Sequence, residues 1–330
     1  MKRKHKRILS VSIILLIVLL VVGYMKFFNG TLIYLSTGLK NTELFKVNDK
    51  VTYTFEANLL MSDARAQYEK VFGSDVWSQE IDGKTFEEYV KDQIRTKLIR
   101  VRCMNEMAAE KGAVLSRDEK DAVSRAVDEY IAGLTPEQIE ELGVTKDNLK
   151  EMFTDFAVAQ RLYNDMTSVM DIEVSADDAR VIDIQYISSD SRSDLESAKA
   201  ELAAGNSFYT VVNKYNAGGS YEYELKRGEM NEAFENAAFN LKSGETSEII
   251  EVDGKFYIIK CTSDNDKVKT EVNKTTILAK KQLEQFNSTF EKYEAGIYVE
   301  WNDRQWKKMS VSANDVYAVS FEEVFQANLK

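Results

Sequence analysis

The sequence has little cysteine, proline or histidine: its 330 residues contain two, one and one of them. Cys103 and Cys261 lie far apart without a CxxC motif, so a disulfide framework is excluded and we expect two buried thiols. A single proline suits a chain rich in helices. No set of histidine or cysteine ligands and no glycine-rich phosphate loop is present, so the sequence indicates no metal and no nucleotide cofactor.

Basic residues are also scarce beyond the N-terminus. The chain has 43 Lys and Arg against 54 Asp and Glu, and five of the bases lie within residues 1–7. The other 38 bases leave the rest of the chain with a net charge of −16. Such a surface disfavours nucleic acid, whose binding requires Lys and Arg to replace phosphate counterions. It favours solubility and suits cationic or unfolded protein partners.

One long apolar run is present at residues 8–25, and Phe27 and Phe28 extend it. Its length reaches the ~20 residues that cross a hydrocarbon core of roughly 30 Å. The basic residues before it favour a cytoplasmic N-terminus, which places the body outside the cell membrane. We therefore predict a transmembrane helix at residues 8–28 and a single-pass, extracytoplasmic protein. The alternative is a cleaved signal peptide, but its apolar core is shorter, about 7–15 residues, and no small-residue cleavage site follows the run.

Residues 58–170 have apolar side chains at spacings of three and four, which is typical of amphipathic helices. Capping boxes at Thr85 and Ser116 pair a hydroxyl with a Glu three residues later, and each marks a helix start. Thr135 precedes the proline at a first helical position, where the missing N–H costs nothing. The sequence thus predicts about five helices joined by short turns.

The pattern changes near Val174. Residues 181–187 alternate apolar and polar side chains, as a half-buried strand does, and helical segments follow. The pair Asp253-Gly254 separates two strand-like runs and predicts a hairpin, because Asp-Gly supplies the positive φ of a tight turn. These elements predict an antiparallel sheet with helices packed on it.

The stretch at residues 226–261, KRGEMNEAFENAAFNLKSGETSEIIEVDGKFYIIKC, resembles the second half of a parvulin domain. The family pattern is a Gly-Gly loop, then R-G-x-M, a Phe four residues on, then A-x-F-x-L-x-x-G-E and a hairpin ending G-x-H-I-I-K. The residues that match it are Gly218, Gly219, Arg227, Gly228, Met230, Phe234, Ala237, Phe239, Leu241, Gly244, Glu245, Ile258, Ile259 and Lys260. Helices before this domain and one helix after it resemble the layout of the SurA- and PrsA-type extracytoplasmic foldases.

This resemblance implies an α+β fold in which one domain is inserted into another. An all-α chaperone-like domain would occupy residues 45–173, and a parvulin-like (PpiC) domain of antiparallel sheet and helices would occupy residues 174–265. A helix at residues 266–296 would return to the chaperone domain and close it. Residues 297–330 form a C-terminal tail that is too apolar for disorder, so we expect it to pack on the body.

The resemblance also implies a proline-binding site. In parvulins a Met and a Phe hold the proline ring, and here they would be Met230 and Phe234. Two family histidines lie nearby on adjacent strands, but the only histidine of this chain is His5. The second family histidine falls at Tyr257.

The first family histidine falls at Tyr186, with Asp183 or Gln185 as alternatives. The Cys or Asp that many parvulins place before the Gly-Gly loop falls near Asn216. Tyrosines can exchange a hydrogen bond through their hydroxyls but do not reproduce an imidazole pair. An ordinary core role for Met230 and the Phe, and cross-strand packing for the tyrosines, stay open as interpretations.

The resemblance implies a membrane-anchored foldase that binds unfolded or partly folded secreted polypeptides and catalyses cis–trans isomerisation of X-Pro bonds. Because both family histidines are replaced, a catalytically inactive holdase chaperone with a parvulin fold is an alternative. A structural or sensory ectodomain is a third, since a fold does not carry a function by itself. The sequence does not indicate an oligomeric state.

Overall fold

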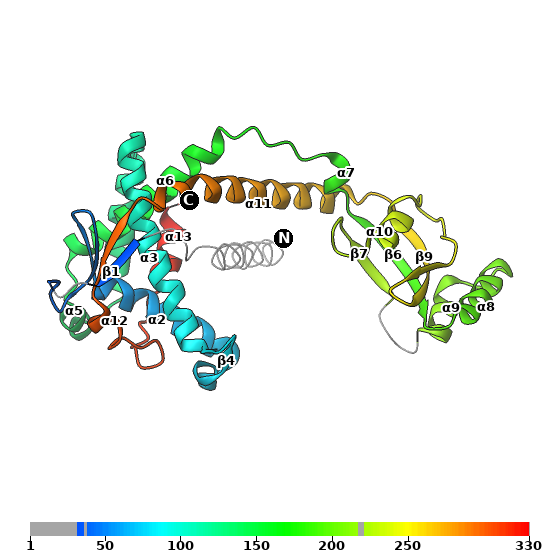
Figure 1. The fold of residues 1–330 in the computed structure, drawn as a ribbon, viewed down its shortest axis with the longest axis horizontal. Helices are drawn as coiled ribbons and strands as arrows, with labels where there is room; N and C mark the ends of the chain where they lie inside the picture. The colour runs from blue at the N-terminus through cyan, green and yellow to red at the C-terminus, as the bar shows by residue number, and fades with distance from the viewer. Residues whose placement is uncertain (1–31, 36–37, 217–220, 330) are drawn as a thin grey trace. The chain divides into compact units, whose positions relative to one another are not determined.

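The computed structural model describes residues 32–35, 38–216 and 221–329, which pack as two units (Figure 1). Unit 1 contains the chain up to Met170 and again from Glu284, and unit 2 contains Asp171–Leu283. The predicted span at residues 8–28 lies outside the described residues. Among the helices that are described, none is long and apolar enough to cross a membrane.

Residues 54–168 of unit 1 form five helices, as predicted. The side chains of Thr85, Ser116, Thr135 and Thr145 each accept a hydrogen bond from the backbone N–H three residues later. Such a cap stabilises a helix by about 1 kcal/mol. The helices are α2 (Thr54–Phe72), α3 (Phe86–Lys111), α4 (Arg117–Ala132), α5 (Pro136–Leu142) and α6 (Lys146–Ser168).

The prediction of an all-α domain is wrong, because unit 1 also contains a four-stranded sheet in the order β1-β10-β2-β3. Phe45 and Trp301 of this sheet are buried and stack at 5.5 Å between ring centroids. The sheet joins segments from opposite ends of the chain, a pairing that no local pattern reveals. Its strands are β1 (Leu32–Leu35), β2 (Glu43–Val47), β3 (Lys50–Tyr53) and β10 (Tyr298–Trp301).

Two short elements lie between α2 and α3, the 3-10 helix η2 (Ser74–Ser78) and the hairpin of β4 (Glu80–Ile81) and β5 (Lys84–Thr85). The C-terminal tail contributes α12 (Asp303–Trp306) and α13 (Phe321–Asn328).

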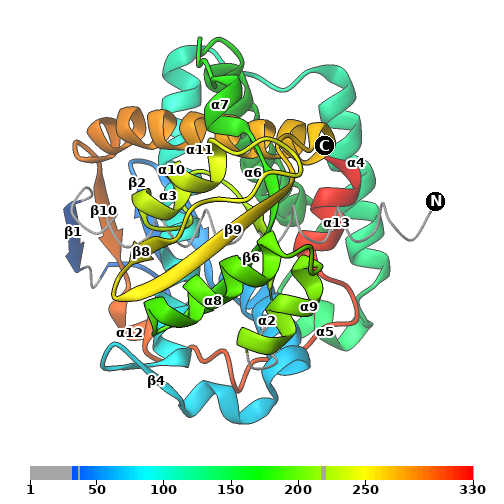
Figure 2. The ribbon, with the colours of Figure 1, turned by 90° about the vertical axis from the view of Figure 1, so that its right-hand side faces the viewer.

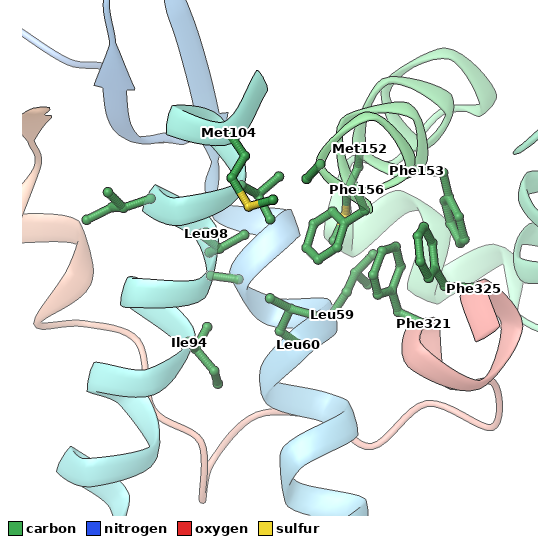
Figure 3. Packing of buried hydrophobic residues seen from close by; sticks show 14 of the residues in the cluster. Leu59, Leu60, Ile94, Leu98, Met104, Met152, Phe153, Phe156, Phe321 and Phe325 are labelled. Carbon is green, nitrogen blue, oxygen red and sulfur yellow. The ribbon is translucent and has the colours of Figure 1, made fainter. Parts of the chain in front are cut away.

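The tail packs on unit 1 through α13. Phe321 lies 4.6 Å from Phe153 and 4.9 Å from Phe156 of α6, measured between ring centroids (Figure 3). The carboxylate of Asp63 accepts the N–H groups of Phe321 and Glu322 at 3.2 and 2.9 Å, so α2 caps the first turn of α13. We call the five buried rings at this contact the α13 cluster: Tyr130, Phe153, Phe156, Phe321 and Phe325.

Unit 2 is built on an antiparallel sheet in the order β7-β6-β9-β8. The predicted hairpin joins β8 to β9, and Asp253 and Gly254 both have positive φ, 50° and 79°. The sequence did not predict β7, which is four residues long and has Glu at two of them. The strands are β6 (Ile182–Ser189), β7 (Glu222–Leu225), β8 (Ile250–Val252) and β9 (Lys255–Ser263).

Helices cover both faces of this sheet (Figure 2). On one face, Ile187 and Ile258 pack with α8 (Arg192–Ala203) and α9 (Phe208–Tyr215). On the other face, the strands pack with α10 (Glu232–Phe239). The remaining helices are α7 (Ala176–Ala179), which precedes β6, and α11 (Lys267–Glu294), which follows β9 and continues into unit 1.

The structure is therefore of the mixed α+β class, as predicted. The sheet of unit 2 is antiparallel, also as predicted, whereas in unit 1 β1 pairs parallel with β10. Cys103 and Cys261 are both buried and free, which confirms the expectation of two separate thiols.

Candidate functional site

Three aromatic side chains meet on the α10 face of the unit 2 sheet. Phe234 of α10 lies 6.3 Å from Tyr186 of β6 and 5.3 Å from Tyr257 of β9, and both contacts are edge-to-face. The two tyrosine rings lie 6.2 Å apart. Phe234 is 3% exposed, whereas the tyrosines are only half-buried. We call these three residues the Tyr–Phe cluster.

The register of the sheet explains why these two tyrosines meet. Tyr186 stands opposite Ile259, and Tyr257 stands opposite Ser188, so the two rings are diagonal neighbours on one face. Diagonal side chains in an antiparallel pair lie about 7–8 Å apart at the backbone, within reach of aromatic rings. Two predicted site residues on different strands are thus brought together with the predicted Phe234.

The alternatives to Tyr186 point to the other side of the sheet. Side chains alternate along a strand, so Asp183 and Gln185 face away from Phe234. Asp183 forms an ion pair with Lys269 at 2.6 Å, and Gln185 donates to Glu222 at 3.1 Å. The hydrogen bond to Asp183 raises the pKa of Lys269 above its usual range. Of the three candidates for the first family histidine, only Tyr186 therefore belongs to the cluster.

The Tyr–Phe cluster has no charged side chain of its own. Its rings offer apolar faces, and its two phenol hydroxyls can donate or accept hydrogen bonds. Among the described residues, no hydrogen bond joins these hydroxyls to each other. The arrangement suits an apolar ring next to a peptide carbonyl, which is the chemistry of an X-Pro unit.

Met230 lies outside this ring cluster, in the turn before α10. Its side chain is 37% exposed, and its backbone N–H donates to the Glu235 carboxylate at 3.0 Å. Glu235 is 8% exposed and belongs to α10, so the helix that carries Phe234 also fixes the backbone of Met230. The structure thus places Met230 at the surface beside the helix rather than in the core.

Sequence reasoning missed a cation stack that holds α10 at its C-terminal end. The guanidinium groups of Arg227 and Arg180 lie 3.9 and 5.0 Å from the ring of Phe239. Asp177 pairs with both arginines, at 3.0 and 2.9 Å. Arg227 is part of the R-G-x-M match, but its partner Arg180 lies before β6, where no motif indicated a role.

Two further neighbours of the site were also missed. Tyr223 of β7 and Ile250 of β8 are partly buried and pack against the core that contains Phe234. Tyr223 carried no signal because β7 was not predicted, and the motif did not single out Ile250 although its strand was predicted. In the described part of the chain, no group of three or more His, Cys, Asp and Glu side chains is placed to hold a metal ion.

Comparison with known proteins supports the resemblance. Residues 183–263 match the family model described as "Rotamase: PPIC-type PPIASE domain". This stretch contains β6 except for its first residue, β7 to β9, and the whole Tyr–Phe cluster. The parvulin-like domain predicted from the motif is therefore confirmed.

Two curated relatives are both foldase protein PrsA. That of Caldanaerobacter subterraneus subsp. tengcongensis is 23% identical over 226 residues, which are 65% of this chain and 71% of that protein. That of Bacillus subtilis is 28% identical over 131 residues, which are 37% of this chain and 45% of that protein. The crystal structure of PrsA from Bacillus cereus is similar with a TM-score of 0.37 and 16% identity, over 88% of this chain and 100% of that one.

Proposed function

We propose, from the premise that residues 183–263 form a PPIC-type domain, that this chain is a foldase that binds unfolded polypeptides and isomerises their X-Pro bonds. The observation that carries this proposal is the Tyr–Phe cluster. It lies within the matched domain and unites the predicted Phe234 with Tyr186 and Tyr257, the tyrosines that the resemblance assigns to the histidine positions of the family.

Rotation of a peptide bond passes through a twisted amide, over a barrier of about 18–20 kcal/mol. An enzyme lowers it by binding the twisted form more tightly than either planar form, and no covalent step is required. In our account the proline ring packs on the half-buried rings of Tyr186 and Tyr257, which the buried Phe234 supports through its contacts with both. The exposed Met230 covers the proline from the side of the turn. The hydroxyls of Tyr186 and Tyr257 donate to the carbonyl oxygen before the proline as it rotates.

A second candidate function is a holdase whose parvulin domain binds X-Pro segments without isomerising them. The replacement of both family histidines by Tyr186 and Tyr257 favours it, because a phenol differs from an imidazole in shape and in proton affinity. A structural ectodomain remains the third proposal, and it requires neither an open site nor a client-binding surface.

Client binding would also need an exposed apolar surface on unit 1. The apolar stripe of α3 does not supply one, because Val90, Ile94 and Leu98 are buried in the core. The end of α2 does: Val71 and Phe72 are 66% and 61% exposed. We propose this end of α2 as a contact for unfolded clients, in line with the rule that exposed apolar patches mark interaction sites.

We also propose that residues 8–28 anchor the chain in the cell membrane, with both units on the outside. The support is the apolar run and its basic flank. Unfolded secreted chains would then be the clients, met as they leave the membrane.

The foldase proposal is tested with a denatured client whose refolding is limited by proline isomerisation. We expect the full-length chain to suppress its aggregation and to accelerate its slow refolding phase. Phe72→Ser should weaken the first effect alone, and Phe234→Ala the second alone. If the chain suppresses aggregation but does not accelerate refolding, the holdase function is favoured. If it does neither, the structural ectodomain is favoured.

A further inference from the structure

Asn216 stands where helix α9 ends, and its side chain bonds to strand β6. Its backbone N–H donates to the Val212 carbonyl at 2.8 Å and closes the helix. Its side-chain Nδ2–H donates to the Tyr186 carbonyl at 2.9 Å, and its Oδ1 accepts the Ser188 N–H at 2.9 Å. One amide group thus satisfies two backbone groups of β6.

This pair of bonds takes the place of strand pairing at a point where, among the described residues, no strand pairs with β6 on the side away from β9. Strand β7 pairs with β6 only as far as the Gln185–Glu222 pair, and the Tyr186 N–H then donates to the Tyr221 carbonyl at 2.9 Å. Beyond it, the groups of β6 that face away from β9 pair with no strand in residues 32–35, 38–216 or 221–329. A neighbouring parallel strand would offer one N–H and one C=O to residues two apart on β6. The amide of Asn216 offers the same two groups.

We infer that Asn216 is a positioning residue of the candidate site, which holds the Tyr186 ring against Phe234 and Tyr257. The inference rests on the proposed function and deepens it. Of the three residues in the Tyr–Phe cluster, only Tyr186 lies directly after the last residue of β6 that pairs with β7. With its carbonyl and the Ser188 N–H both held, the peptide planes on either side of Ile187 keep their orientation. The Tyr186 ring then stays 6.2–6.3 Å from the other two.

The chemistry of the position requires an amide. An aspartate has almost the same shape but no N–H, and it would set a carboxylate oxygen against the Tyr186 carbonyl. Asn216→Asp therefore removes one bond and adds a repulsion without a change of volume. Asn213→Asp is the matched control, because Asn213 is exposed, lies on the same helix and receives the same charge.

The test compares these variants in the full-length chain by hydrogen exchange and by binding of a short Ala-Pro-containing peptide. We expect Asn216→Asp to speed exchange within residues 186–189 and to weaken peptide binding about tenfold, the size expected when a buried group loses its partner. Asn213→Asp should change neither. Unchanged exchange in Asn216→Asp overturns the inference, whatever the activity of the protein.

A double-mutant cycle with Tyr186→Leu separates positioning from simple stability. If Asn216 acts through the Tyr186 ring, Asn216→Asp weakens binding in the wild type but hardly at all in Tyr186→Leu, since contacting residues are not additive. If Asn216→Asp weakens peptide binding equally in the wild type and in Tyr186→Leu, the positioning role is overturned, and the bonds of Asn216 only stabilise the fold. A wild type that binds no X-Pro peptide overturns the proposed function and the positioning role together, while its exchange pattern still reports the bond itself.

Discussion

The α13 cluster in unit 1 and the Tyr–Phe cluster in unit 2 both contain edge-to-face ring contacts, but their rings are buried to different extents. All five rings of the α13 cluster are at most 8% exposed. In the Tyr–Phe cluster only Phe234 is buried, and both tyrosines reach the surface. The first cluster is part of a core, whereas the partial exposure of the tyrosines in the second fits our proposal that they offer ring faces and hydroxyls to a ligand.

The largest effect is expected from Phe153→Ala in the α13 cluster. Phe153 is fully buried and contacts Tyr130, Phe321 and Phe325. Loss of such a ring lowers the free energy of unfolding by about 3–5 kcal/mol. Hydrogen exchange in α4 and α6 under urea reports this loss for unit 1. Binding of an X-Pro peptide to unit 2 should not change, and a parallel loss of binding would break the comparison.

The second-largest effect is expected in the stability of unit 1, which should depend on pH. Burial raises the pKa of Asp63, the cap of α13, to about 6 from an ordinary value of 3.8. The folded state then holds this proton more tightly than the unfolded state does. Its contribution to stability is complete below about pH 4 and is lost as the pH rises through about 6, by up to roughly 3 kcal/mol.

Asp63→Asn should remove this component. Urea unfolding of unit 1 between pH 4 and 7 measures it, with the wild type compared at each pH. If the variant and the wild type keep the same slope, the carboxyl of Asp63 does not govern the docking of α13.

The third prediction concerns two neighbours on β9 that face opposite sides of the sheet. Tyr257 belongs to the Tyr–Phe cluster, whereas Phe256 packs on the α8 and α9 side, and both are half-buried. Tyr257→Leu should weaken X-Pro peptide binding about tenfold, since an aromatic pair is worth about 0.5–1.5 kcal/mol beyond its area. Phe256→Leu, measured by the same titration, should leave binding within about twofold of the wild type. Equal losses would assign both rings to the core.

The smallest effect is expected in the pH profile of isomerisation. Residues 183–263, which match the PPIC-type domain, contain no histidine, so we expect no imidazole to take part. The catalysed rate should therefore vary by less than about twofold between pH 5.5 and 7.5, where an ordinary histidine would titrate. The rate of X-Pro isomerisation is measured over this pH range in an assay that uses no coupling protease. The rate with Phe234→Ala is subtracted as the uncatalysed background. An inflection near pH 6.5 would point to a titrating group that the Tyr–Phe cluster does not contain.

Sequence patterns predicted the features of this molecule that depend on near neighbours. The caps at Thr85 and Ser116 and the Asp253-Gly254 turn each rest on residues at most three apart. The motif that includes Phe234 was recognised for the same reason, because its residues keep a fixed spacing.

Features that depend on distant pairing were missed. The contact between β1 and β10 joins two ends of the chain, and the α13 cluster brings Phe321 to Phe153. The apolar spacing of a helix is the same whether the helix packs against the C-terminal tail or binds a client protein. The burial of α6 by α13 could therefore not be predicted from the sequence. At the site, the choice between Tyr186 and Gln185 required the register of β6 with β9.

Our central proposal is that a parvulin domain with Tyr186 and Tyr257 at the positions predicted for the family histidines still isomerises X-Pro bonds. Exchange spectroscopy by NMR tests it most directly, because it measures cis–trans interconversion of an X-Pro peptide at equilibrium with the full-length chain added. We predict that the chain, at a concentration far below that of the peptide, raises the rate of cis–trans exchange at least about tenfold. This is less than the usual contribution of a positioned proton donor, which is about 100-fold or more. Phe234→Ala should abolish the increase and Phe256→Leu should retain it. Exchange at the uncatalysed rate with the wild-type chain, while the peptide is bound, would contradict the claim and leave a binding module.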